Sequence, residues 1–470
     1  MNMPQIVVLW TDALLFIFLI FGVLSIVAVR REPYWIGHWY QVAKSGLGMV
    51  TGLILVLYLV VALLDSMHFR PALDVGARGQ GGPRYGVEVL SVLDLVLGPL
   101  RVQSERSYSA PLAAYLYNKE VKIGMGGEVR QFYPRLRYGG NHLGDPEQEL
   151  VWDVVYKTIY GVIYGLTLWF LGSWLLLWIL AYRSGGGWWD QLRLVLANRT
   201  VLPWRAVIIE IGLILILAAV ATNLARYYHL LGTDKIGEDV LYQALKSVRT
   251  GMLIGILTTT VMLPAALVLG LMARYFRGWV DDIIQYVYTT LSSIPDVLLI
   301  AAVILMLQVY MDQHAAAFAS PVERADLRLL FLCLVLGITS WTGLCRLLRG
   351  ETFKLRELDY VQSAIALGVR PFTVLFRHVF PNVLHIIIIK TTLDFSGLVL
   401  AEAVLSYVNI GVDPTMNSWG SMINGARLEL ARDPIVWWSL IAAFLFMFTL
   451  VLAANLFADV VRDALDPQLR

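Results

Sequence analysis

Long apolar runs separated by short polar loops dominate the chain. Nine runs approach the length of about 20 residues that a helix needs to cross a bilayer. They cover residues 7–29, 48–64, 156–181, 206–226, 250–274, 284–311, 327–347, 384–409 and 435–459. The pattern therefore predicts an all-α integral membrane protein with about nine transmembrane helices.

The composition leads to the same class of protein. Of the 470 residues, 58% are hydrophobic and only 15% are charged. An average soluble domain is about half apolar and about a quarter charged. A soluble chain of this composition would expose large apolar patches to water, and a disordered chain would be far more polar.

Basic residues are informative through their position, because the net charge of +2 is too small to indicate a nucleic-acid partner. They concentrate in the short loops 30–47, 182–205 and 346–383, and are fewer in 227–248, 312–326 and 410–434. By the positive-inside rule this bias predicts an outside N-terminus and an inside C-terminus. Arg30 and Arg31 follow the first apolar run, which favours a retained anchor over a signal peptide.

The polar stretch 184–190 suggests a division into two parts. We expect an N-terminal three-helix module over 1–205, with an extracytoplasmic segment at 65–155, and a six-helix core over 206–470. Within the first part, residues 88–100 have apolar residues at helical spacing. This stretch is interpreted either as an amphipathic helix on the membrane surface or as part of a small subdomain packed on the helices.

The loop 350–383 lies between two apolar runs on the expected cytoplasmic side. Good helix formers over 353–367 predict a helix that ends at Gly368, because glycine accepts the left-handed conformation of a C-cap. Pro371 suits the first turn of a second helix, expected over 371–379 and ending before Pro381. Two short helices joined by a tight turn form a rigid protrusion that could transmit movement from a soluble partner.

The same loop resembles the EAA loop of importer-type ABC permeases. The matching positions are Gln362, Ser363 and Ala364, then Gly368, and then Arg377, His378 and Pro381. The spacing from Gly368 to Pro381 agrees with the family pattern, and His378 before Pro381 and Asn382 is typical of the dipeptide/oligopeptide branch. Gln362, Ser363 and Phe380 depart from the Glu, Ala and Leu of that pattern.

Three further segments resemble the same branch: 230–245 (LLGTDKIGEDVLYQAL), 418–427 (SWGSMINGAR) and 463–470 (DALDPQLR). The resemblance implies a multi-pass permease subunit of the bacterial inner membrane that imports peptides or peptide-like solutes. It also implies a second homologous permease subunit, one or two ATP-binding subunits that carry ATP and Mg²⁺, an extracytoplasmic solute-binding protein and surrounding membrane lipid. Residues of the loop 350–383 would couple to the ATPase.

The sequence contains no phosphate-binding GxxxxGK[ST] motif, as expected if ATP hydrolysis lies on another chain. No cofactor is therefore expected on this chain, and it is predicted not to be an enzyme. Two cysteines, Cys333 and Cys345, and seven scattered histidines suggest neither a disulfide framework nor a metal site. An ion-coupled secondary transporter is the alternative function.

Charged residues within the apolar runs are costly and often functional. Lys390, Asp394 and Glu402 lie in one run, where they would either line the translocation path or gate it. For Lys390 and Asp394 the other interpretation is a mutual i, i+4 ion pair. Asp12 and Glu210 are expected near helix ends, where water at the interface suffices.

A second group of polar residues lies in the expected outside loops. Thr233, Asp234 and Asp239 either start the next helix or also contact the binding protein. Trp419 is interpreted as an interface anchor, with a loop plug as the alternative, and is a further candidate for contact with the binding protein. Two spacings, Gly161/Gly165 and Gly251/Gly255, predict close helix approach.

Overall fold

Helices dominate the computed structural model, which describes residues 4–29, 33–73, 84–123, 129–276, 278–314 and 320–465. Nine helical segments in these ranges are long and apolar enough to cross a membrane. They are α1 (Trp10–Val29), α3 (Gly46–Ser66), α6 (Pro146–Ser184), α8 (Trp204–Leu224), α9 (Val240–Phe276), α11 (Asp296–Gln313), α12 (Pro321–Arg356), the segment Pro371–Tyr407, and α17 (Trp438–Leu465). The predicted all-α membrane fold is confirmed.

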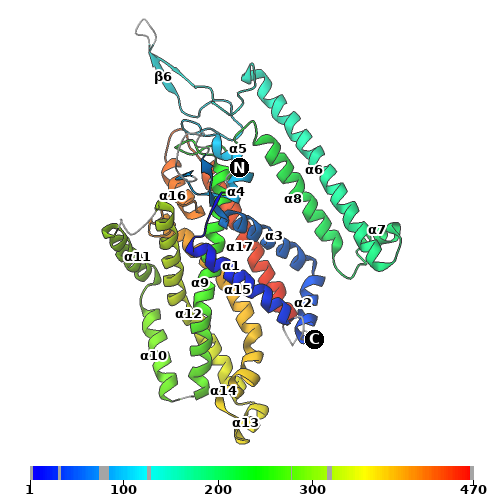
Figure 1. Cartoon of the computed structure of the whole chain (residues 1–470), viewed down its shortest axis with the longest axis vertical. Coiled ribbons are helices and arrows are strands. Elements are labelled where there is room, and N and C mark those ends of the chain that lie inside the picture. The colour runs from blue at the N-terminus through cyan, green and yellow to red at the C-terminus, as the bar shows by residue number, and fades with distance from the viewer. Residues whose placement is uncertain are drawn as a thin grey trace.

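Shorter helices connect these segments or lie at their ends. They are α2 (Pro33–Lys44), α4 (Val92–Val96), α5 (Gly98–Val102), α7 (Trp188–Leu196), α10 (Trp279–Ser293), α13 (Asp359–Ala366) and α16 (Trp419–Glu429). The segment Pro371–Tyr407 comprises α14 (Pro371–Val374), a π-helical turn η2 (Leu375–Val379) and α15 (Phe380–Tyr407). Figure 1 places α13 and α14 at one end of the molecule and α16 and β6 toward the other.

The apolar run 284–311 is not one helix, contrary to the prediction. It is divided between α10 and α11, which are separated at Ile294 and Pro295. Ile294 has an extended backbone conformation (φ −89°, ψ 129°), as expected for a residue that precedes proline. The continuous hydropathy of the run conceals this break.

Short strands lie between α3 and α6 and before α1. Strands β1 (Gln5–Val7), β2 (His68–Arg70) and β5 (Leu90–Ser91) form an antiparallel sheet in the order β1-β2-β5, with Ile6 opposite Phe69 and Phe69 opposite Leu90. Two hairpins pair β3 (Ala72–Leu73) with β4 (Arg84–Tyr85) and β6 (Glu120–Ile123) with β7 (Val129–Phe132). The N-terminal strand β1 is thereby tied to the segment that follows α3.

Residues 88–100 do not form one amphipathic helix. They form β5, α4 and α5, and a capping box between Ser91 and Asp94 starts α4. Leu93 and Leu100 are buried, so the stretch packs on other parts of the protein. Of the two interpretations of this stretch, the structure supports the packed subdomain.

The long helix α9 lies at the centre of the bundle. It packs against α12, α3 and α15, and Met262, Val248 and Leu253 place it in three different buried apolar clusters. Pro264 lies inside α9 without ending it. Movement of α9 relative to its neighbours would therefore disturb the core along most of the bundle.

Packing groups the helices differently from the division expected at residue 205. Helix α3 packs on α9 and α17, and α1 packs on α12 and α9, so both helices belong to the central bundle. Helix α8 packs mainly on α6, and the α6–α8 hairpin stands beside that bundle (Figure 1). The polar stretch at 184–190 marks the turn within this hairpin and no boundary between packed units.

The Gly161/Gly165 spacing brings α6 and α8 together as predicted. A Cβ atom on Gly161 would lie 2.8 Å from the Cα of Val220, and one on Gly165 would lie 2.7 Å from the Cα of Ile216. The Gly251/Gly255 spacing instead leaves room for two aromatic rings. A Cβ atom on Gly251 would meet the Trp419 ring at 2.7 Å, and one on Gly255 would meet the Phe395 ring.

Candidate functional site

The protruding loop predicted at 350–383 is present at one end of the bundle (Figure 1). Its first helix is not a separate element over 353–367, because α12 continues to Arg356 and α13 begins at Asp359. Leu358 between them has an extended backbone. The protrusion is thus α13 and the start of the next span, set on the end of α12.

Gly368 terminates α13 as predicted. Its φ of +75° lies in the left-handed region. The Gly368 N–H donates to the Ile365 carbonyl at 3.0 Å, and the Val369 N–H donates to the Ala364 carbonyl at 3.1 Å. These two bonds make a Schellman motif, and Pro371 then starts α14.

The second helix of the protrusion does not end before Pro381, contrary to the prediction. It continues through η2 into α15, where Pro381 occupies the first turn. In η2 the Phe380 N–H donates to the Leu375 carbonyl, a wider turn than that of an α-helix. The Asn382 side chain donates to the His378 carbonyl at 2.7 Å. This wider turn accommodates the proline, so the helix runs without a break from α14 into the membrane-spanning α15.

An apolar core holds the protrusion on the bundle. Val361, Val374 and Val379 are fully buried in one cluster with Leu344 and Leu348 of α12. Arg356 donates to the Arg274 carbonyl at 3.3 Å, which ties the end of α12 to α9. The protrusion is therefore a rigid extension of the bundle.

The family-matched residues differ in exposure. Gln362, Ser363, Gly368, Arg377 and Pro381 are exposed, His378 is half-buried and Ala364 is buried. Gln362 donates to the Arg356 carbonyl at 2.9 Å. Ala364 therefore packs the protrusion on the bundle, while the other positions face outward.

Three large apolar side chains at the tip were missed from the sequence. Leu367 is 83% exposed, and Phe372 and Phe376 are each 60% exposed. Phe372 and Phe376 are four residues apart and so lie on the same face. These three residues could have been found from the sequence, because they lie opposite the buried positions of α13 and α14. Exposed apolar groups of this kind mark a surface that contacts either another protein or lipid.

Asp281 is a second feature that the sequence did not reveal. At the start of α10, it accepts from the Arg349 guanidinium of α12 at 2.6 Å and 2.9 Å, and Arg274 of α9 lies 3.3 Å away. The hydrogen bonds from Arg349 hold the pKa of Asp281 below its usual value. The carboxylate thus joins three helices beneath the protrusion.

The charged residues of α15 are partnered within their own helix. Lys390 bonds to Asp394, as the ion-pair interpretation predicted. Glu402 is buried and accepts from the Ser406 hydroxyl at 2.6 Å. A role of these three residues in translocation or gating stays a prediction.

The residues singled out at 233–239 are largely structural. Thr233 is fully buried, accepts from the Ser109 N–H at 2.7 Å and donates to the Ser107 carbonyl at 2.9 Å. Asp239 caps α9, since its Oδ1 accepts from the Tyr242 N–H at 3.1 Å. Asp234, which is half-buried, is the member of this group with a partly accessible side chain.

Trp419 is not an interface anchor. Its side chain is 1% exposed, donates to the Ala244 carbonyl at 3.1 Å and packs on Gly251. It fixes α16 to α9 from within, and the loop-plug alternative stays a prediction. Since Thr233, Asp239 and Trp419 are all buried, none of these side chains offers a surface to a partner in this conformation.

A buried charged triad joins the segment before α6 to the start of α9. His229 Nδ1 lies 2.8 Å from Asp239 Oδ2, and its Nε2 lies 3.6 Å from Glu105 Oε1. Burial alone would lower the pKa of His229, but the two carboxylates raise it to about 9. Burial would raise the pKa of Glu105, but His229 and three backbone N–H groups lower it to about 2. His229 and Glu105 are therefore both charged at neutral pH.

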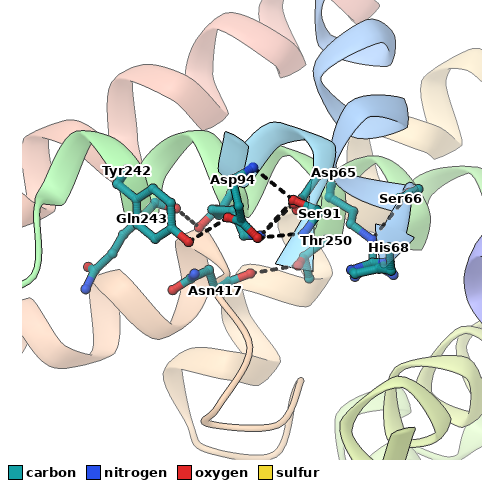
Figure 2. A network of polar contacts seen from close by, with 12 residues as sticks. Asp65, Ser66, His68, Ser91, Asp94, Tyr242, Gln243, Thr250 and Asn417 are labelled. Atoms are coloured by element: carbon teal, nitrogen blue, oxygen red, sulfur yellow. Dashed lines mark hydrogen bonds and ion pairs between the residues drawn. The ribbon is translucent and has the colours of Figure 1, made fainter. Parts of the chain in front are cut away.

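Lys246 of α9 forms the centre of a second network. Its Nζ donates to Asp65 of α3 at 2.6 Å and to Asp94 of α4 at 3.0 Å. Ser91 donates to Asp65 at 2.7 Å, and Tyr242 donates to Asp94 at 2.7 Å. Figure 2 shows Asp65, Ser91, Asp94 and Tyr242 converging from these elements. The network holds the segment after α3 on the end of α9.

Arg249 extends the polar contacts to the N-terminal helix. It donates to Asp12 of α1 at 2.6 Å, and Asp326 of α12 lies 3.6 Å from it. His68 Nδ1 lies 2.8 Å from the other oxygen of Asp12. The expectation that Asp12 is hydrated at the interface is wrong, because its side chain is buried. Glu210 is also buried, and neither of its carboxylate oxygens has a hydrogen-bond partner.

Within the described ranges, no group of three or more His, Cys, Asp or Glu side chains is arranged to hold a metal ion. Cys333 and Cys345 are buried free thiols. The described residues thus form a membrane bundle with a rigid protrusion at one end and buried ion-pair networks toward the other.

Known proteins are similar to this chain in sequence. The family of binding-protein-dependent transport system inner membrane components matches residues 262–470. The glutathione transport system permease protein GsiD of Pectobacterium atrosepticum is 33% identical over 242 residues, which is 52% of this chain and 73% of the relative. The oligopeptide transport system permease protein OppC of Mycobacterium tuberculosis is 33% identical over 242 residues, which is 52% of this chain and 77% of the relative.

A third relative is the dipeptide transport system permease protein DppC of Bacillus subtilis, 26% identical over 242 residues, which is 52% of this chain and 69% of the relative. The chain belongs to the family of binding-protein-dependent transport system inner membrane components. It is a multi-pass permease subunit of an ABC importer of the bacterial inner membrane, and these findings support that class over an ion-coupled transporter. Permeases of this class work with ATP-binding and solute-binding partners.

Proposed function

We propose that this permease subunit imports peptides or peptide-like solutes, driven by ATP hydrolysis on a separate subunit. The relatives that support this substrate class are permeases for oligopeptides, dipeptides and glutathione. In this proposal ATP and Mg²⁺ bind to the partner ATPase. The complex comprises this chain, a second homologous permease, one or two ATP-binding subunits and an extracytoplasmic binding protein.

The protrusion at α13 and α14 is the docking element for the ATPase. The supporting observation is its two-sided construction. Val361, Val374 and Val379 bury one side in the bundle, while Leu367 and Phe372 expose the other. Because η2 connects α14 to α15 without a break, a displacement of the docked ATPase would reach the membrane span.

The orientation follows from this assignment. With α13 and α14 inside, the end that carries α16 and β6 lies outside, in agreement with the N-out, C-in prediction (Figure 1). The permease core then consists of α3 and α9–α17, which pack together, with α1 clamped to it. The α6–α8 hairpin is an added element at the side of this core.

Charge insertion at the tip tests the docking role. Leu367→Asp is expected to abolish co-purification of the ATP-binding subunit, because a carboxylate would be placed in an apolar interface. Val129→Asp in β7 is the matched control, since Val129 is also exposed but lies in the hairpin at the opposite end. Equal recovery of the ATPase with both variants would contradict the docking role. Uptake of a labelled dipeptide by cells that carry the complete system tests the substrate class.

A further inference from the structure

A polar groove of about 260 Å³ lies between α6 and α8, the two helices that stand beside the central bundle (Figure 1). It is found at the end of this hairpin away from α7, where α8 ends at Leu224. Its lining residues are Tyr160, Gly161, Tyr164, Ala219, Thr222, Asn223 and Arg226. None of them belongs to the protrusion or to the polar networks around His229, Lys246 and Arg249.

The close approach of α6 and α8 forms the floor of the groove. Gly161 is buried there, and a Cβ atom on it would lie 2.8 Å from the Cα of Val220. The Asn223 side chain donates to the Lys157 carbonyl at 2.6 Å, which ties α8 to α6 beside the groove. These contacts fix the shape of the groove without using Arg226.

Arg226 is the only charged residue among the described residues that line the groove. Its side chain is exposed, and its guanidinium has no hydrogen bond or ion pair within the described part of the chain. A guanidinium presents N–H donors in a planar fork that matches the oxygen atoms of a phosphate group. The described lining therefore offers positive charge with no acidic side chain to balance it.

The exposed face of α6 changes character along the helix. Tyr160 and Tyr164, which are 59% and 55% exposed, are followed on the same face by the exposed Leu168 and Leu171. Leu171 lies seven residues beyond Tyr164, or about 10 Å deeper along the helix. Tyrosine is typical of the membrane–water interface, and leucine is typical of the hydrocarbon core. This order is the order of a phospholipid, in which acyl chains follow a charged headgroup.

We propose that this groove binds the phosphate group of an anionic phospholipid, with Arg226 contacting the phosphate oxygens and one acyl chain lying along Leu168 and Leu171. In the orientation proposed above, this lipid belongs to the outer leaflet. An anionic headgroup is favoured over a zwitterionic one, because the described lining carries a positive charge and no acidic group that would attract a choline cation. The inference concerns the α6–α8 hairpin and does not rest on the peptide substrate class.

The experiment compares phosphatidylglycerol and phosphatidylcholine with identical acyl chains. Native mass spectrometry of the detergent-purified complex would measure the dissociation constant of each lipid. The wild type is expected to bind phosphatidylglycerol at least tenfold more tightly than phosphatidylcholine. Arg226→Gln should weaken phosphatidylglycerol binding at least tenfold, because it removes the charge-assisted hydrogen bonds to the phosphate.

A steric variant and a matched control locate the effect in the groove. Thr222 is exposed on α8 and lines the groove, so Thr222→Trp would fill the groove without changing its charge. It should weaken phosphatidylglycerol binding as strongly as Arg226→Gln does. Arg183→Gln is the control, because Arg183 is an exposed arginine in the last turn of α6, at the α7 end of the same hairpin. This variant should bind as the wild type does.

Equal phosphatidylglycerol affinity in the wild type and Arg226→Gln would overturn the proposal. Equal weakening in Arg226→Gln and Arg183→Gln would also overturn it, because any arginine at the membrane surface would then have the same effect. Displacement of phosphatidylglycerol by excess inorganic phosphate would contradict a lipid site, since a bound acyl chain gives the lipid the advantage. Recovery of the assembled complex by size-exclusion chromatography shows that each variant is folded.

Discussion

Asp281 and Arg349 form a bidentate ion pair between α10 and α12, with N–O distances of 2.6 Å and 2.9 Å. The pair lies beneath the protrusion, and Arg349 also donates to Gln285 at 2.8 Å. A bidentate guanidinium–carboxylate contact fixes both distance and orientation. The pair therefore sets the angle at which α10 meets the helix that supports the coupling element.

Asp281→Asn should lower the free energy of unfolding of the purified complex by about 1–3 kcal/mol, the usual cost of losing hydrogen bonds to a charged partner. Chemical denaturation in detergent would measure the loss. The exchanged pair Asp281→Arg with Arg349→Asp should recover part of this loss of stability.

Because the pKa of Asp281 is lowered in the folded protein, the contribution of Asp281 to stability is present above about pH 4 and is lost as the pH falls through the lowered pKa. Asp281→Asn should remove that acid dependence, and an unchanged acid transition would contradict this account.

Gly368→Ala should cost about 1–2 kcal/mol locally and reduce the coupling of uptake to ATP hydrolysis. The cost arises from backbone strain at the left-handed φ of +75°. It does not arise from a steric clash, because a Cβ atom there would meet nothing within 4 Å. Gly368→Asn should be milder, because asparagine tolerates this conformation. Transport per ATP hydrolysed in proteoliposomes is the measurement.

Gly350→Ala is the matched control for Gly368. Gly350 lies in α12 without positive φ, and a Cβ atom there also has open space. Alanine at this helical position should leave coupling unchanged and stabilise the helix by up to about 1 kcal/mol. If uptake were coupled to ATP hydrolysis equally well in both alanine variants, the Schellman turn at Gly368 would have no special role in that coupling.

Alkaline pH should loosen the segment before α6 through His229. The pKa of this imidazole is about 9 in the folded protein, above its usual value of about 6.5. Its contribution to stability is therefore full below about pH 6.5 and is lost as the pH rises through about 9. Hydrogen exchange of the backbone around Glu105 between pH 6 and 10, corrected for intrinsic rates, would show the opening.

His229→Gln tests the source of that transition. The variant removes the ionisable ring, so protection around Glu105 should be lower at neutral pH and should no longer fall with alkaline pH. His142→Gln is the control, because its ring pairs with Asp153 rather than with Asp239. A persistent alkaline opening in His229→Gln would assign it to another group.

Gly161→Leu should separate the α6–α8 hairpin. A Cβ atom at this position already lies 2.8 Å from the Cα of Val220, and overpacking of this kind costs about 1–3 kcal/mol. Gly172→Leu in the same helix is the control, since a Cβ atom there meets nothing within 4 Å. Proteolysis between α7 and α8 should accelerate in Gly161→Leu alone. If the hairpin is an added element, ATPase docking should survive in both variants.

Features set by local sequence were predictable. Hydropathy located the nine long helices, and the chemistry of glycine and proline located the turn at Gly368 and the start of α14. Proline rules used alone failed at Pro381, because a π-helical turn accommodates the ring, and at Pro295, because the apolar run conceals the break. Local rules describe the backbone conformation that a residue favours, whereas the packing of neighbouring turns determines the conformation that it adopts.

The ion pairs could not be predicted from local sequence, because their partners lie far apart along the chain. Asp12 and Arg249 are 237 residues apart, and Glu105 meets His229 only once the segment before α6 has folded onto α9. The grouping of α3 with the bundle and of α8 with α6 is also a tertiary fact that a polar stretch at 184–190 does not encode. By contrast, the exposed Leu367 and Phe372 follow from the helix faces of the protrusion once its buried side is known.

The Asp12–Arg249 contact also constrains the order of biosynthesis. The two residues are 237 positions apart, so at about 5–20 residues per second α1 emerges roughly 10–50 s before its cationic partner in α9. During that interval α1 carries a carboxylate whose final counter-ion does not yet exist. Helix α1 can therefore complete this contact only after α9 has been synthesised.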